Sequence, residues 1–171
     1  MPLTPIGAVA RGLLAGAAGT AAMDLLLYAR YRRDGGKDPL PGWEFSAGVQ
    51  DWDAAPAPAQ VGRRLVEGLF QTRLPDSRAR LVNNITHWAY GISAAGGYGL
   101  LAGSLARPRV WPGAPFGATV RATGYAVLPA AGLYKPITEY DRVTLAKDLS
   151  AHLVYGLTTA AAFRVLSGRS R

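Results

Sequence analysis

The sequence predicts an all-α membrane protein: a bundle of four transmembrane helices from two parallel two-helix repeats, plus an amphipathic interfacial helix in the first loop. Three observations predict this fold class: four long stretches nearly free of charge, their many small residues, and two recurring motifs. The 171 residues fit a single integral membrane domain, 1–171. The net charge of +8 and the mean hydropathy of +0.07 resemble those of a soluble basic protein. The distribution of charge is therefore more informative than its average.

Charged side chains are nearly absent from four stretches, which predict transmembrane helices at 6–29, 83–105, 114–135 and 144–166. Each is long enough, or nearly so, to cross about 30 Å of hydrocarbon at about 1.5 Å per residue. A soluble, alanine-rich bundle is the alternative. Such a bundle needs polar outer faces, and residues 85–106 contain no side chain that is charged at pH 7.

Small residues in these stretches favour helix packing in lipid. Gly12 and Gly16 form one small-x-x-x-small pair, and Gly99 and Gly103 form another. Because lipid gives helices little hydrophobic drive to associate, close backbone contact between small residues has to hold them together. A secretory signal peptide at 1–23 is a second alternative for the first stretch. The arginines that follow it are more typical of a retained span; these are Arg30, Arg32 and Arg33.

Two pairs of segments suggest an internal duplication. Pro5–Arg11 aligns with Pro115–Arg121, and His87–Ser93 aligns with His152–Thr158. We therefore expect repeat 1 to cover 5–105, including a long loop at 30–82, and repeat 2 to cover 114–168. Two spans in each repeat return the chain to its starting side, which makes the repeats parallel. Chance similarity among Gly- and Ala-rich helices is the alternative.

The loops contain one helical pattern. Residues 59–74 place apolar side chains on one helical face and charged ones opposite, which predicts an amphipathic helix that lies in the membrane interface or caps the bundle. Residues 34–58 lack periodicity and are expected to be irregular. Pro129 predicts a kink in the third span. The expected N-caps are Asp76 or Ser77 for the second span and Asp141 or Thr144 for the fourth.

The charges divide unequally between the two sides of the predicted bundle. The side of the termini has no acidic residue and seven arginines, which are Arg11, Arg107, Arg109, Arg121, Arg164, Arg169 and Arg171. The opposite side has twelve Lys or Arg residues and all eleven acidic ones. The raw count of basic residues favours a cytoplasmic long loop, whereas the acid-free cluster favours cytoplasmic termini, which we expect. Attraction to anionic lipid explains the basic excess without nucleic acid as a partner.

Polar residues recur at matching positions in the second and fourth predicted spans. Asn83, His87 and Tyr90 lie on one helical face, Asp148, His152 and Tyr155 repeat the spacing, and Asp24 lies toward the same side of the membrane. Because intramembrane polar groups are costly, these residues are the candidate polar centre. One hypothesis is a hydrogen-bond network between the second and fourth spans, direct or through water, that fixes the bundle. Another is a proton- or ion-responsive site, since histidine titrates near neutral pH.

A haem or metal held between His87 and His152 is a third hypothesis, and no other cofactor or metal is expected. Arg11 and Arg121 are expected at the same place in each repeat, six residues after a proline, where they would contact lipid head groups or form an anion site. No catalytic residue is predicted, because the chain has no cysteine, no GxSxG or HExxH motif and no phosphate-binding loop. The sequence therefore does not predict an enzyme.

Three segments resemble the YagU-like family of bacterial inner-membrane proteins, a domain of unknown function. They are Gly12–Thr20, Asn84–Gly91 and Asp148–Gly156, the last two sharing the pattern HxxYG. The resemblance implies a multi-pass protein of the bacterial inner membrane, and the four predicted spans place both termini on one side. It also implies a loose link to acid stress, and it transfers no catalytic residue. The Gly-rich faces leave a further alternative, an assembly subunit that packs against a second copy or another membrane protein.

Overall fold

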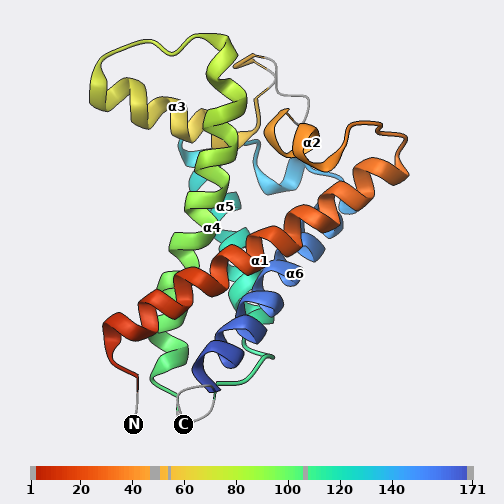
Figure 1. Cartoon of the computed structure of the whole chain (residues 1–171). Helices are drawn as coiled ribbons and strands as arrows, with labels where there is room; N and C mark the ends of the chain where they lie inside the picture. Colours follow the sequence, from red (N-terminus) through yellow and green to blue (C-terminus); the bar gives the residue numbers. More distant parts are fainter. Residues whose placement is uncertain (1–2, 47–50, 54, 106–107, 169–171) are drawn as a thin grey trace.

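The computed structural model describes residues 3–46, 51–53, 55–105 and 108–168, and within them it is helical without a strand (Figure 1). This confirms the all-α class. The α-helices are α1 (Pro5–Arg33), α2 (Leu40–Ser46), α3 (Ala57–Phe70), α4 (Ala79–Gly103), α5 (Gly113–Ala130) and α6 (Arg142–Gly168). Two short 3₁₀ turns, η1 (Asp76–Arg78) and η2 (Ile137–Glu139), precede α4 and α6.

Helix α1 is the longest element, with 29 residues. Pro5 begins it, and the Thr4 hydroxyl accepts a hydrogen bond of 3.1 Å from the Gly7 N–H, as expected at a helix N-cap. The helix continues through the basic residues at its end to Arg33, and Gly35 then reverses the chain with a φ of 95°. The span predicted at 6–29 is therefore part of a longer helix.

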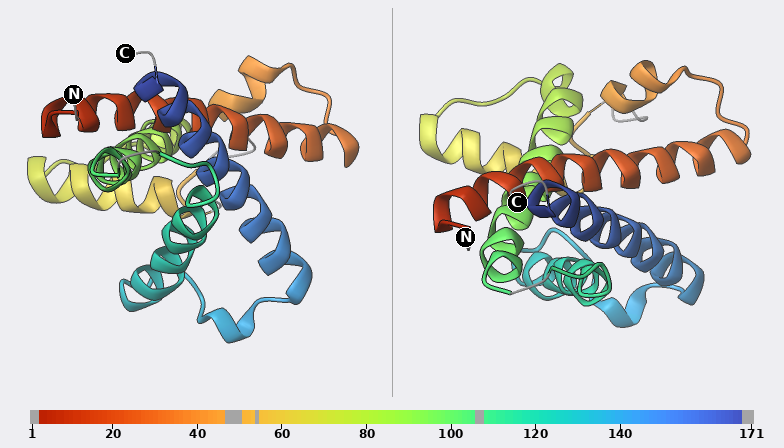
Figure 2. Two further views of the ribbon diagram at one scale, coloured as in Figure 1. Left: turned by 90° about the horizontal axis from the view of Figure 1, so that it is seen from below. Right: turned by 60° about the horizontal axis from the view of Figure 1, so that its bottom comes forward.

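Helix α1 packs against both α4 and α6, and α5 packs on the other side of α6 (Figure 2). Glycines let the backbones approach. A Cβ atom at Gly12 or Gly16 would overlap Ala95 of α4, and one at Gly19 would overlap Thr159 of α6. The α5–α6 pair is built in the same way, because Gly117 packs directly on the backbone of α6. The bundle is thus held by close backbone contact, the packing expected of helices in lipid.

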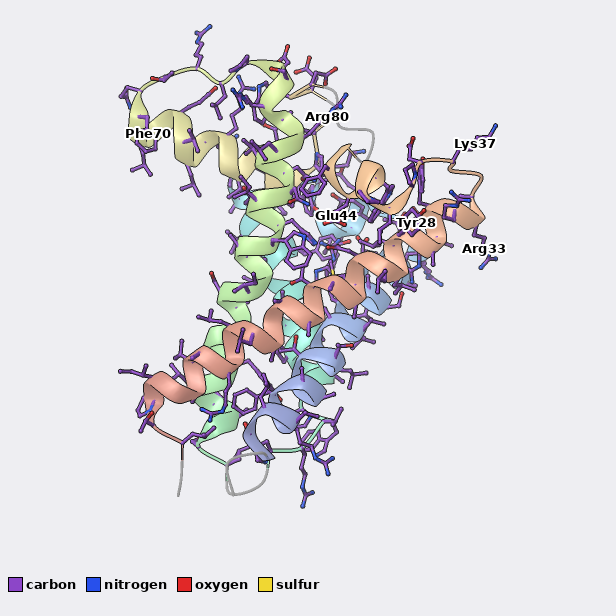
Figure 3. The ribbon with its side chains drawn as sticks, in the orientation of Figure 1. Tyr28, Arg33, Lys37, Glu44, Phe70 and Arg80 are labelled. Carbon is purple, nitrogen blue, oxygen red and sulfur yellow. The ribbon has the colours of Figure 1, made fainter. Side chains whose placement is uncertain are left out.

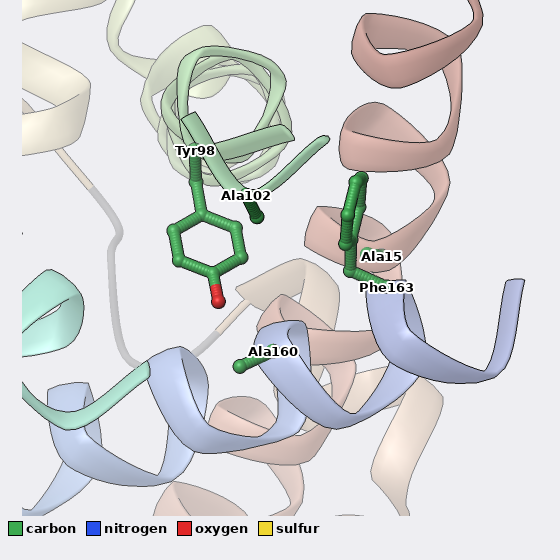
Figure 4. Close-up of a cluster of buried hydrophobic side chains, with 5 residues drawn as sticks. All are labelled: Ala15, Tyr98, Ala102, Ala160 and Phe163. Atoms are coloured by element: carbon green, nitrogen blue, oxygen red, sulfur yellow. The ribbon is translucent and has the colours of Figure 1, made fainter. Parts of the chain in front are cut away.

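The centre of the bundle consists of small and aromatic side chains (Figure 4). The cluster joins α1, α4 and α6 through Ala15, Tyr98, Ala102, Ala160 and Phe163. The ring of Tyr98 also contacts Phe116 of α5, with 4.7 Å between the ring centroids. Many of the larger aliphatic side chains of the same helices are exposed instead, among them Ile6, Leu14, Leu25, Leu101 and Val165.

Helices α2 and α3 lie at the end of the bundle opposite the termini, where Figure 3 labels their side chains. Gly62 lets α3 pack on Val82 and Thr86 of α4, while Leu69 and Phe70 stay exposed. Helix α2 falls inside residues 34–58, so the expectation of an irregular segment there is wrong for this part. Its helical turn is held in place by Glu44, whose carboxylate accepts hydrogen bonds from Asn84 and Trp88 of α4.

Three local predictions are also corrected or settled. Helix α5 ends at Ala130 directly after Pro129, and Gly132 has a φ of 67°, so the proline lies in the last turn instead of kinking a longer span. Asp141 caps α6, because its carboxylate accepts bonds of 2.9 Å from two N–H groups of the first turn. Neither Asp76 nor Ser77 caps α4, since the 3₁₀ turn η1 continues directly into that helix.

Two of the described helices, α1 and α6, are long and apolar enough to cross a membrane, instead of the four predicted. Helix α4 has 25 residues but falls short because Arg80, two asparagines, His87 and many glycines lower its hydropathy. Helix α5 has only 18 residues and includes Arg121. The four spans were predicted from the lack of charged side chains, whereas a helix that crosses lipid also needs strongly apolar side chains.

Candidate functional site

The first polar contact joins α1 and α4 through Asp24 and His87. Nε2 of His87 lies 2.8 Å from Oδ1 of Asp24, and Asp24 is only 6% exposed. The sequence placed these residues on the same side of the membrane but did not pair them. A buried carboxylate is stabilised by an adjacent donor, and imidazole supplies one donor when neutral and two when protonated. The pair can therefore hold one or two protons.

Two further oxygen atoms in this contact are buried and have no hydrogen-bond partner. Oδ2 of Asp24 is one, and Oγ1 of Thr20, one turn earlier on α1, is the other. Thr20 faces Gly91 of α4, where a Cβ would overlap its hydroxyl. Oδ1 of Asn83, one turn before His87, is also buried without a partner. Because such atoms are costly to leave unpaired, each of them marks a place for a ligand or a water molecule.

The second polar contact joins α5 and α6 through Arg121 and Asp148. The Arg121 guanidinium donates to Oδ2 of Asp148, and the Tyr125 hydroxyl donates to the same oxygen over 2.9 Å. The guanidinium also lies over the Tyr125 ring, 3.6 Å from its centroid, and 5.8 Å from that of Tyr134. Arginine stays charged at physiological pH, so this contact is a permanent ion pair with a cation–π contribution.

The remaining candidate residues of the polar centre make other contacts. Nδ1 of His152 lies 2.9 Å from the backbone oxygen of Asp148, within its own helix. The Tyr155 hydroxyl donates to the Gly91 carbonyl over 2.6 Å and so joins α6 to α4. Tyr90, which the sequence matched with Tyr155, is 50% exposed. A hydrogen bond between the second and fourth predicted spans therefore exists, but the partner of His87 comes from α1.

Arg11 and Arg121 do not occupy the same place in the two halves, and that prediction is wrong. Arg11 donates to the Leu166 carbonyl near the end of α6, whereas Arg121 binds Asp148 near its beginning. These positions lie 18 residues apart, or about 27 Å at 1.5 Å per residue. Arg121 is thus buried within the bundle and does not belong to the basic cluster predicted at the termini. Arg107, Arg169 and Arg171 of that cluster lie outside the described residues.

The helix contacts follow a different register from the aligned segments. Gly16 of α1 lies against Gly91 and Ala95, and Gly113 of α5 lies against Gly156 and Ala160. The partner residues on α4 and α6 match the sequence alignment, since both pairs are 65 residues apart. Gly16 and Gly113, however, are 97 residues apart, while the aligned segments Pro5–Arg11 and Pro115–Arg121 are 110 apart. The internal duplication itself stays a prediction.

Sequence reasoning missed three contributors to these contacts. Thr20 lies four residues before Asp24, and Tyr125 lies four after Arg121, so helical spacing alone could have indicated both. Glu44 carried no such signal, because it sits in the segment that was expected to be irregular. Its carboxylate accepts hydrogen bonds from Asn84 and Trp88, which lie on either side of His87 in the sequence of α4.

The described residues contain no group of three or more His, Asp or Glu side chains that could hold a metal ion. A haem between His87 and His152 stays a prediction. The only histidine nitrogen contact across helices is the one from His87 Nε2 to Asp24, within the described residues, and an iron at that nitrogen would have to displace the carboxylate. The other ring nitrogens, Nδ1 of His87 and Nε2 of His152, have no hydrogen-bond partner among the described residues.

Comparisons of the chain with family models, with curated proteins and with solved structures give no match. The resemblance to the YagU-like family therefore stays a prediction. The class that fold and site define is an all-helical protein with two candidate membrane-spanning helices and two polar contacts between helices.

Proposed function

We propose that this chain is an integral membrane protein whose buried Asp24–His87 pair takes up and releases a proton. The observation that carries the membrane assignment is the distribution of side-chain size. The buried side of α1 consists of alanine, glycine, threonine and Asp24, while Ile6, Leu14 and Leu25 are exposed. Soluble proteins bury their large aliphatic side chains, whereas a helix in lipid can turn them outward.

Helices α1 and α6 support this proposal. In their most apolar windows only 39% and 33% of the residues are buried within the fold, respectively. The core helix of a soluble protein would be mostly buried. We infer that α4 and α5 also cross the membrane as less apolar spans, because they pack against α1 and α6 along glycine faces and expose Ile85, Leu101 and Val127.

The end of the bundle opposite the termini has the composition of a membrane interface. One aromatic group there consists of Tyr28, Tyr31 and Trp43, and a second of Tyr125, Tyr134 and Tyr140. Tyrosine and tryptophan are enriched at the level of lipid head groups. Helix α3 reaches this level because Arg64 donates to the Ala131 carbonyl just after α5, over 2.6 Å. Its exposed Leu69 and Phe70 suit an interfacial helix.

The lack of native cysteines allows a direct test of the topology. Single cysteines at Lys37, Trp111 and Lys135, all exposed, would be labelled from one side of the membrane with an impermeant maleimide. Four spans place residue 111 on the opposite side from residues 37 and 135. Labelling of all three from one side would limit the spans to α1 and α6. A protein that is monodisperse without detergent would overturn the membrane assignment.

The proton-binding role rests on the 2.8 Å contact between His87 and Asp24 inside the bundle. Histidine changes its charge near neutral pH, so protonation of His87 would turn a neutral–anionic pair into an ion pair and alter the packing of α1 on α4. Such a centre suits a protein that senses or conducts protons. We include in this proposal the predicted link to acid stress. We also include a location in the inner membrane with cytoplasmic termini.

Nuclear magnetic resonance of ¹⁵N-histidine tests this role directly, because the chain has only two histidines. His152→Gln leaves the signal of His87 alone, and His87→Gln leaves that of His152. We expect the His87 signal to change with pH and this change to be altered in Asp24→Asn, while that of His152 is unaffected. A His87 signal that does not titrate, or that ignores Asp24→Asn, would contradict the proposal.

A further inference from the structure

We infer that the Asp24 carboxylate and the Thr20 hydroxyl form a binding site for a monovalent cation. The inference rests on the proposed function, since it concerns the same carboxylate. It is based on two buried oxygen atoms that have no hydrogen-bond partner, Oδ2 of Asp24 and Oγ1 of Thr20. Their residues are 6% and 1% exposed.

The two atoms lie on the same helical face. Thr20 and Asp24 are four residues apart on α1, and both face α4, Thr20 at Gly91 and Asp24 at His87. Gly91 makes room for the hydroxyl, because a Cβ at this position would overlap Oγ1 of Thr20. Tyr155 of α6 closes the site, since its ring lies near Gly91 and its hydroxyl binds the Gly91 carbonyl. The site is thus at the junction of α1, α4 and α6.

The chemistry of the ligands selects the class of cation. Carboxylate, hydroxyl and carbonyl oxygens are the ligands that hard cations prefer, whereas transition metals favour imidazole and thiolate. A single carboxylate balances a single charge. Divalent cations in proteins are held by several carboxylates, and Asp24 has no acidic neighbour on its own helix within two turns. A sodium-like ion therefore fits the site better than calcium or magnesium.

Other ionisable side chains lie near Asp24 and His87, but none of them takes the place of either residue in the contact. Helix α4 contributes His87, and α6 contributes His152, which is close enough for electrostatic interaction with His87. Helix α2 contributes Glu44, whose carboxylate binds Asn84 and Trp88. On α1, Arg30 is turned toward α6, where it binds the Lys147 carbonyl over 2.9 Å.

Thermal unfolding of the full chain in detergent tests the site. The probe is NaCl replaced at constant ionic strength by N-methyl-D-glucamine chloride. We expect Na⁺ to raise Tm. Equal Tm values in both salts would overturn the site and leave water as the occupant.

Thr20→Val removes the hydroxyl while keeping the shape of the side chain. We expect it to lose the Na⁺-dependent rise in Tm. Thr119→Val is the matched control, because Thr119 is an exposed helical threonine whose hydroxyl binds the Pro115 carbonyl. It should keep this rise. A Na⁺ effect that survives in Thr20→Val would contradict the assignment of the ligand.

His87→Gln separates the two proposals. It removes the imidazole but leaves Oδ2 of Asp24 and Oγ1 of Thr20 in place, so we expect the Na⁺ effect to persist. If the His87 signal responds to pH but Na⁺ has no effect in the wild type, the cation site is wrong and the proton-binding role stands. A Na⁺ effect that is lost in His87→Gln would contradict the assignment of the ligands.

Discussion

The α1–α4 pair and the α5–α6 pair are built alike in backbone and differently in charge. Each brings two helices together along glycines, Gly16 against Gly91 in the first and Gly117 against Gly156 in the second. In the first pair the carboxylate Asp24 faces a histidine. In the second pair the carboxylate Asp148 faces Arg121, which also stacks on Tyr125.

This difference separates a permanent ion pair from one that depends on pH. Arginine keeps its charge at every physiological pH, while histidine changes its charge near neutrality. The α5–α6 pair is therefore expected to be equally stable across that range, and the α1–α4 pair is expected to respond. The buried ionisable groups of one bundle can thus have two roles, one structural and one responsive.

Removal of Asp148 should have the largest effect. Asp148→Ala leaves the buried Arg121 without its carboxylate, which is expected to lower the free energy of unfolding by about 3 kcal/mol, the low end for a buried pair because the Asp148 side chain is 39% exposed. Asp24→Ala should cost less at about pH 8, because its partner His87 can remain neutral there. Thermal unfolding of both variants in detergent measures the difference. Equal losses would mean that the two contacts do not differ in charge as described.

Adding a methyl group to a glycine at a helix contact should have the next largest effect on stability. A Cβ at Gly156 would overlap the backbone of Gly113 and lie 2.7 Å from the Gly117 nitrogen, so Gly156→Ala should destabilise the α5–α6 pair by about 1–3 kcal/mol. Gly97→Ala is the control, because a Cβ at Gly97 meets nothing within 4 Å. If both variants have the Tm of the wild type, close backbone contact does not hold the helices together.

Tyr155 and Tyr90, which the sequence alignment matched, should differ in how much stability is lost when each is changed to phenylalanine. Tyr155→Phe removes the buried bond of 2.6 Å to Gly91 and should cost about 1 kcal/mol. Tyr90→Phe should be neutral, since Tyr90 is half-exposed. Chemical or thermal unfolding compares them. A larger loss for Tyr90→Phe would show that the matched faces are arranged differently from the description above.

Substitutions at the N-termini of α6 and α4 should give the smallest difference in stability. Asp141→Ala removes the cap of α6, whereas Ser77→Ala should have no effect because no side chain caps α4. Hydrogen bonds from the Thr144 hydroxyl and N–H hold the pKa of Asp141 below 3.8. The stabilisation by Asp141 is therefore present above this pH and is lost as the pH falls below it. The wild type should lose stability more steeply on acidification than Asp141→Ala, as pH-dependent unfolding would record.

Much of the helical fold could be predicted from the sequence, because long stretches without charge mark α1, α4, α5 and α6 independently of their packing. The ends were less predictable. Charged residues such as Arg33 continue a helix once it leaves the apolar region, and helix α2 has too few residues to show periodicity.

The candidate site could be predicted only within each helix. The spacing of Asn83, His87 and Tyr90 places them near one face, but it does not tell which neighbouring helix that face meets. In the structure α4 packs mainly against α1, so His87 meets Asp24. The depth of Arg121 was missed because the alignment with Arg11 ignored the different register of the glycine contacts.

The placement of small side chains inside and large ones outside also determines which substitutions the chain can accept. In most soluble proteins the surface varies freely and the interior is constrained by volume. Here exchanges among leucine, isoleucine and valine at exposed positions such as Leu14 or Leu101 should be nearly silent in a mutational scan. The least tolerant positions should be the smallest residues, Gly12, Gly117 and Gly156, where even one added methyl group meets backbone.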